Sequence, residues 1–204
     1  MTFDGLTDLE SDAFTEIINI GMGRAAASLG QMVNEEISLS VPKVEVISSI
    51  NATQQLADIS PTNLSGVTQE FSGTLTGKAM LLFPEDQSLN LVRLLLKDTV
   101  PLELMSEMEK EALTEVGNII LNACFGTVAN SLAFEIDSTI PSFFSGASNA
   151  LFKDQNKENT VLMLHVDFSM PSKDIQGFVT FLMDMSSSLY IVQSIKNYVH
   201  KFSG

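Results

Sequence analysis

The chain repeats itself after about half its length, and this repeat limits the folds that are open to it. Segments 16–19 and 115–118 both read Glu-x-x-Asn, at an offset of 99 residues (115 − 16). The apolar pattern of residues 77–83 returns at residues 177–183, at an offset of 100 (177 − 77). A repeat of this period indicates two copies of one structural unit with a one-residue slip between them.

Two like halves fold either as two small domains or as one pseudo-symmetric domain. A half-sheet on its own would leave an unpaired edge and an uncovered apolar face. Hydrophobic residues make up 45% of the chain, which is ample for one packed core. We therefore predict one domain over residues 1–204, made of two repeats over about 1–100 and 101–204.

Hydrophobic periodicity predicts the same elements in each repeat. The fold class is α/β, with pseudo-twofold duplicated α-β-β-β-α halves that share one largely antiparallel sheet and two long helices on one face. The capping boxes Thr7-x-x-Glu10 and Ser106-x-x-Glu109 predict where these helices start. Residues 49–66 are polar and are predicted as a loop. The predicted helices cover 7–34, 86–97, 106–133 and 186–199, and the predicted strands 41–48, 67–75, 77–83, 140–144, 161–168 and 177–183.

The charge of the chain opposes two classes of partner. Against 11 basic residues stand 25 acidic ones, a formal net charge of −14, which disfavours binding to nucleic acid and to anionic membranes. The first residues lack the cationic and apolar regions of a signal peptide, and no continuous apolar run approaches the ~20 residues of a membrane helix. We therefore expect a cytoplasmic protein with no nucleic-acid partner and no membrane partner.

The chain has little material for a metal centre of its own. It contains one cysteine, which excludes an internal disulfide, and two histidines, which leave little material for a His-rich metal site. Cys124 occupies the position of Ala25 in the first repeat, which favours a small buried core residue over a reactive thiol. His165 and His200 have no evident catalytic partner in the sequence.

The duplicated Glu and Asn residues are the candidate site. Residues at i and i+3 share a helix face, so Glu16 with Asn19, and Glu115 with Asn118, each present a carboxylate beside an amide. By spacing alone, two solvated helix faces without chemistry explain the pairs better, because tandem copies inherit surface residues as readily as functional ones. Asparagine is nevertheless a poorer helix former than Ala, Lys or Gln, and its return favours a role beyond propensity.

The extended motif resembles a known family. An acidic residue followed by Glu-x-x-Asn occurs twice, with Asp12 leading the first copy and Glu111 the second, and this pattern resembles the CheC, CheX and FliY phosphatases of bacterial chemotaxis. Asn19-Ile20-Gly21-x-Gly23 and Val41-Pro42-x-Val44 support the resemblance. It spans nearly the whole chain, and two sites in one chain without an added domain look most like the CheC type.

The resemblance implies a reaction and a partner. The substrate would be a phosphorylated CheY-type response regulator, and the reaction hydrolysis of its aspartyl phosphate. Asn19 and Asn118 would orient the attacking water, and Glu16 and Glu115 would dock a lysine of the receiver. The receiver would supply its own Mg²⁺, so this chain would need no cofactor. The residues expected to contact the partner are Asp12, Gly23, Glu111 and Asn122.

Two other functions remain open at this point. The middle domain of the flagellar switch protein FliM has a similar fold without the paired signature, so a non-catalytic chemotaxis or flagellar-switch interaction module is the main alternative. CheC relatives commonly bind the deamidase CheD, which makes CheD a second candidate partner. The presence of Glu and Asn in both helices favours catalysis.

Overall fold

The fold is known from a computed structural model, which describes residues 5–60, 63–95, 105–152, 159–170 and 173–202. The first half contains α1 (Asp8–Val33), β1 (Ser38–Ser48), α2 (Ser49–Ile59), β2 (Leu64–Gly73), β3 (Gly77–Pro84) and α3 (Glu85–Leu95). The second half contains α4 (Met105–Leu132), β4 (Ile136–Ser138), β5 (Ser142–Gly146), α5 (Ser148–Leu151), β6 (Thr160–Met170), β7 (Lys173–Met183) and α6 (Met185–Phe202).

All seven strands form one sheet in the order β1-β6-β7-β3-β2-β4, with β5 also paired to β2, and every pairing is antiparallel. This order stays the same when the elements of the two halves are exchanged. In the central β3–β7 ladder Met80 pairs with Thr180, its own counterpart at the offset of 100 (180 − 80). A pseudo-twofold axis therefore passes between these two residues, which confirms the predicted duplicated α/β fold.

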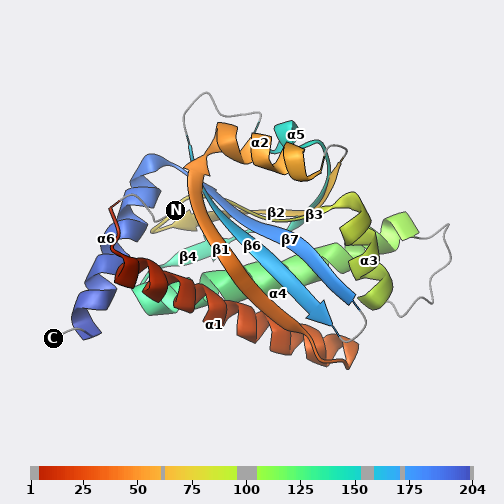
Figure 1. The fold of residues 1–204 in the computed structure, drawn as a ribbon, viewed down its shortest axis with the longest axis horizontal. Coiled ribbons are helices and arrows are strands. Elements are labelled where there is room, and N and C mark those ends of the chain that lie inside the picture. The colour runs from red at the N-terminus through yellow and green to blue at the C-terminus, as the bar shows by residue number, and fades with distance from the viewer. Residues whose placement is uncertain (1–4, 61–62, 96–104, 153–158, 171–172, 203–204) are drawn as a thin grey trace.

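Helices cover both faces of the sheet and enclose two hydrophobic clusters (Figure 1). Side chains of a strand alternate between faces, so Ala79, Leu81 and Phe83 belong to the larger cluster under α1 and α4, whereas Met80 and Leu82 belong to the smaller one under α2 and α5. Figure 1 places α3 and α6 at the two ends of the larger cluster. The sheet is thus the middle layer of three.

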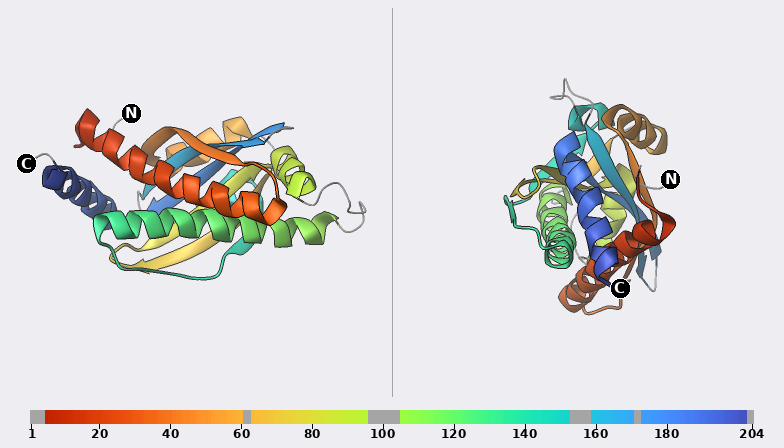
Figure 2. Two further views of the ribbon diagram at one scale, coloured as in Figure 1. Left: turned by 90° about the horizontal axis from the view of Figure 1, so that it is seen from below. Right: turned by 90° about the vertical axis from the view of Figure 1, so that its left-hand side faces the viewer.

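The two long helices lie side by side and run in opposite directions (Figure 2). A Cβ on Gly21 of α1 would lie 3.2 Å from the carbonyl oxygen of Ala123 on α4, so the two backbones approach closely at this glycine. Gly21 therefore serves helix packing. The placement of both helices on one face agrees with the prediction.

The segment predicted as a loop over residues 49–66 is instead mostly helical. It forms α2, which Ser48 caps by accepting a hydrogen bond of 3.2 Å from the Asn51 N–H. Ala52 and Leu56 are fully buried against the sheet and lie one turn apart, so two apolar residues anchor an otherwise polar helix. The short helix α5 occupies the corresponding place in the second half and contacts α2.

The first of the two predicted capping boxes is present. Thr7 caps α1 and exchanges hydrogen bonds with Glu10, and the bond from the Thr7 N–H holds the pKa of the exposed Glu10 carboxyl below its ordinary value. In the second half α4 already starts at Met105, so Ser106 lies within the helix. Glu109 accepts a hydrogen bond of 2.9 Å from Ser88 on α3 instead.

Helix α4 is apolar because it is a core helix. Within residues 107–132 a window of 18 residues has a mean hydropathy of 1.3, so by length and composition alone this helix could cross a membrane. Along the helix, however, Leu113, Val116 and Ile120 are fully buried in the larger cluster. Packing against α1 and the sheet accounts for its apolar composition.

Cys124 is buried in this cluster, as predicted, and burial raises the pKa of its thiol to about 12. The thiol is therefore protonated at neutral pH and a poor nucleophile.

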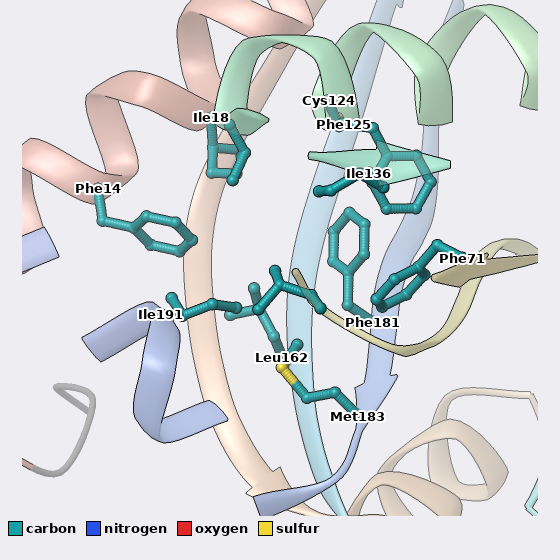
Figure 3. A pocket seen from close by; sticks show the side chains of 12 residues that line it. Phe14, Ile18, Phe71, Cys124, Phe125, Ile136, Leu162, Phe181, Met183 and Ile191 are labelled. Atoms are coloured by element: carbon teal, nitrogen blue, oxygen red, sulfur yellow. The ribbon is translucent and has the colours of Figure 1, made fainter. Parts of the chain in front are cut away.

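Close by, a cavity of about 30 Å³ opens where α1, α4, α6 and the sheet meet (Figure 3). Its lining is apolar and includes the ring of Phe181, which packs against Phe125 with centroids 5.5 Å apart.

A buried carboxylate bridges two strands beneath the other face of the sheet. Glu45 on β1 contacts Nε2 of His165 on β6 at 2.7 Å and Nζ of Lys43 at 2.9 Å. No sequence pattern pointed to this partner for His165. Burial raises the pKa of the Glu45 carboxyl, but the hydrogen bonds from Lys43 and His165 outweigh burial and hold the pKa below its ordinary value of 4.5.

Neutralising Glu45 is expected to make folding less sensitive to acid. A carboxyl with a depressed folded pKa contributes stability above its unfolded pKa and loses it as the pH falls through the folded pKa. Glu45→Gln should therefore lower the free energy of unfolding by about 1 kcal/mol at pH 7, a difference that shrinks below about pH 4.5. Urea unfolding of both proteins between pH 7 and pH 3 measures this. A difference that stays constant across the range would contradict the assignment.

Candidate functional site

The duplicated residues lie on the outer faces of the two long helices. Glu16 on α1 and Glu115 on α4 are exposed, and Asn19 and Asn118 are partly buried. All four carboxylate and amide groups belong to the described part of the chain and none is in the core. The arrangement leaves both pairs accessible to a docking protein.

Buried neighbours fix the rotation of each helix. In α1, Ile17 and Ile18 are at most 2% exposed and turn Glu16 and Asn19 outward. In α4, Val116 is fully buried, and at Gly117 the helix lies directly on β2. The same helix face is therefore presented at both sites, although Gly117 stands where the first half has Ile18.

At the first site the main chain of β1 holds the asparagine. Oδ1 of Asn19 accepts a hydrogen bond of 3.3 Å from the Val41 N–H. A backbone N–H can only donate, so the atom that faces it must be the amide oxygen. The NH₂ group of Asn19 consequently points away from β1.

At the second site a side chain, that of Asn122, holds the asparagine. Oδ1 of Asn118 accepts a hydrogen bond of 2.7 Å from Nδ2 of Asn122, one turn further along α4. Oδ1 of Asn122 in turn accepts from Nε2 of Gln69 on β2 at 3.3 Å, and Ser138 Oγ lies 3.5 Å from it. The amide oxygen is thus engaged at both sites, and in both the NH₂ end is left for a partner.

The other predicted site residues lie on the same helix faces. Asp12, Gly23 and Glu111 are exposed, and a Cβ on Gly23 would meet no atom within 4 Å. Asn122 is exposed as well, but its bond to Asn118 gives it a neighbour within the chain. Their contacts with a partner stay a prediction.

Gln69 belongs to the second site and was missed in the sequence. It is 2% exposed, although it stands on the same face of β2 as the buried Val67 and Phe71. A polar residue in the inward-facing series of a strand was the signal that could have found it.

The site contains amides that can orient a bound group and carboxylates that can attract a cation. Within the described residues no three His, Cys, Asp or Glu side chains gather around a common point. An amide NH₂ donates hydrogen bonds to water or to phosphoryl oxygens without titrating, and a carboxylate pairs with a cation. Each helix face is thus suited to contact with a phosphorylated, cation-bearing surface.

Known proteins resemble this chain in sequence and in fold. No family model matches the chain. The CheY-P phosphatase CheC of Bacillus subtilis (strain 168) is 25% identical over 145 residues, which cover 68% of each chain. FliY of Thermotoga maritima has a similar fold, with a TM-score of 0.74 at 18% identity over 95% of this chain and 99% of the FliY chain.

Two further solved structures have the same fold at lower similarity. The FliM middle domain of H. pylori has a TM-score of 0.65 at 11% identity, covering 93% of this chain and 99% of its own. A chain of the CheX-CheY-BeF₃-Mg²⁺ complex of Borrelia burgdorferi has a TM-score of 0.52 at 23% identity, covering 80% and 96%. The chain is thus similar in sequence to CheC and shares its fold with FliY, the FliM middle domain and CheX.

Proposed function

We propose that this protein is a cytoplasmic phosphatase that hydrolyses the aspartyl phosphate of a CheY-type response regulator. The observation that carries the proposal is the pair of accessible asparagines whose amide oxygens are both engaged within the fold, each with a glutamate one turn before it. Two different sets of neighbours give the two amides the same orientation. A solvated face without a function would not require that coincidence.

Asn19 and Asn118 position the attacking water. Hydrolysis needs a water molecule in line with the bond between phosphorus and the leaving aspartyl oxygen, and the barrier falls when this geometry is held in advance. An outward NH₂ donates a hydrogen bond to that water or to a phosphoryl oxygen. An amide that cannot rotate keeps this donor aimed at one point.

Glu16 and Glu115 dock the receiver. Each carboxylate is exposed on the same face as its asparagine and can pair with a lysine of the partner, which fixes the register of the helix against the phosphorylated site. Asp12 and Glu111 extend the negative stripe by one turn. Gly23 offers a smooth stretch of helix on which the partner can approach closely.

The metal ion of the reaction belongs to the partner. Phosphoryl groups are stabilised by Mg²⁺ in such transfers, and we assign that ion to the receiver. The side chains of this chain then act on the receiver without a cofactor of their own. A relative named CheY-P phosphatase and a similar chain in complex with CheY support this assignment of partner.

A dephosphorylation series tests the proposal. Asn19→Ala and Asn118→Ala should each remove the activity of one site, and the double variant should lower the turnover of a phosphorylated CheY by roughly 100-fold or more, because a positioned donor of this kind is worth about that much. Asn197→Ala is the matched control at an exposed asparagine of another helix, α6. Wild-type turnover by a folded double variant would refute the proposal.

The alternative is a non-catalytic module that binds a receiver or CheD. The similarity to the FliM middle domain favours it, because the fold alone does not specify an enzyme. The two functions differ in stoichiometry. A phosphatase shortens the lifetime of a phosphorylated receiver when present at a small fraction of its concentration, whereas a binding module has no effect at that ratio.

A further inference from the structure

Three side-chain amides are connected in series behind the second site, and we propose that Gln69 and Asn122 are positioning residues for Asn118. The inference rests on the proposed function of Asn118 and adds to it the device that aims this amide. The series starts at the Thr139 carbonyl and runs through Gln69 and Asn122 to Asn118. We call it the amide relay.

The direction of the relay follows from its first member. Nε2 of Gln69 donates a hydrogen bond of 2.6 Å to the Thr139 carbonyl, and a carbonyl can only accept. The same nitrogen faces Asn122 at 3.3 Å, so the Asn122 atom there is the oxygen. Its nitrogen is then the donor to Asn118 at 2.7 Å. One main-chain carbonyl therefore sets which end of Asn118 faces the partner.

The relay is costly for the fold, which argues that it serves the site. Gln69 is 2% exposed, and its Oε1 is buried without a hydrogen-bond partner among the described residues. A buried acceptor without a partner destabilises a protein. An apolar residue at this inward position would fit the series formed by Val67 and Phe71 better, so stability does not explain the glutamine.

The first site has no such relay. At the offset of 99 (122 − 23) Gly23 replaces Asn122, and the Val41 N–H of β1 orients Asn19 directly. Main-chain contacts survive side-chain substitution. The two sites therefore respond differently to mutation: only the second depends on other side chains to orient its asparagine.

The test uses one-site enzymes. In an Asn19→Ala background, where only the second site works, Asn122→Asp replaces one NH₂ by an oxygen and removes the donor to Asn118. The Asn118 amide then turns its own NH₂ toward the new carboxylate and presents its oxygen outward. We expect kcat for a phosphorylated CheY to fall by up to about 100-fold, with a smaller change in KM.

Asn122→Ala in the same background separates orientation from charge. It frees Asn118 to rotate without reversing it, so kcat should lie between those of the Asn19→Ala parent and the Asn122→Asp variant. A third variant, Gln69→Leu, removes the start of the relay while keeping the position apolar, and should behave like Asn122→Ala. Thermal unfolding of each variant verifies that the fold is retained.

The matched control is an amide pair with the same spacing elsewhere. Gln193 donates to Asn197 at 3.1 Å on the exposed face of α6, and Asn197→Asp should leave kcat unchanged. Unchanged kcat in Asn122→Asp would overturn the relay. If the Asn19→Ala, Asn118→Ala protein is inactive at the same time, the proposed function stands and only the relay fails; if that protein is active, the proposed function fails first.

Discussion

Gly117→Ala is expected to lower the free energy of unfolding by about 2–3 kcal/mol, as overpacking of a close contact does. A Cβ at this position would lie 2.0 Å from Cγ2 of Val67, which is fully buried on β2. Valine is branched at Cβ and has little rotamer freedom, so relief requires α4 to move away from the sheet. Because Asn118 is the next residue, the second site should lose activity as well. Urea unfolding and one-site turnover measure the two effects.

Gly126→Ala on the same helix is the control for helix propensity. No atom lies within 4 Å of a Cβ at Gly126, so this change should stabilise the protein by about 0.5–1 kcal/mol. Combining Gly117→Ala with Val67→Ala should cost less than the sum of the two single changes, because the methyl group gains room. Additive losses would show that the contact with Val67 is not the cause.

Phe181→Ala is expected to have the largest effect on stability, a loss of about 3–5 kcal/mol. The ring is 6% exposed, packs edge-to-face on Phe125, and borders the existing cavity (Figure 3). Removing the ring leaves a void that merges with the existing cavity. Three helices and the sheet surround this region, so the structure has little freedom to collapse. Denaturant unfolding measures the loss.

The enlarged cavity provides a second measurement. Its walls are apolar, so it should stay dry and bind benzene, which should raise the melting temperature of Phe181→Ala but leave that of the wild-type protein unchanged. Phe144→Ala is the control, because Phe144 is only partly buried and packs against the smaller cluster. Equal losses from the two substitutions would contradict this account of the core.

The duplication made most of the fold predictable. The long helices, the strand pattern and the shared sheet follow from the repeat and from hydrophobic periodicity, which are local properties of the sequence. Helix α2 was missed because only Ala52 and Leu56 anchor it, too few for a visible stripe. The predicted start of α4 at Ser106 lies within one residue of Met105, where the helix begins, although Glu109 accepts its hydrogen bond from Ser88 on α3.

The sequence predicted where the candidate residues lie on the helices but not the hydrogen bonds that orient them. Spacing alone predicted that Glu16 lies beside Asn19 and Glu115 beside Asn118, because residues three apart share a helix face. Gln69 is 49 residues away from Asn118 in the sequence (118 − 69) and is connected to it only through Asn122. Contacts of this kind depend on tertiary packing, which no local pattern records. The bond from Val41 to Asn19 was hidden for the same reason.

The symmetric pairing of Met80 with Thr180 has a consequence for how such a chain can evolve. In an assembly of two identical half-chains, one sequence would have to serve both helices, and any change would appear twice. Covalent fusion removes that requirement while the β3–β7 seam keeps its geometry. Each helix can then acquire its own set of supporting residues. The site on one helix can change or lose its activity while the site on the other stays the same.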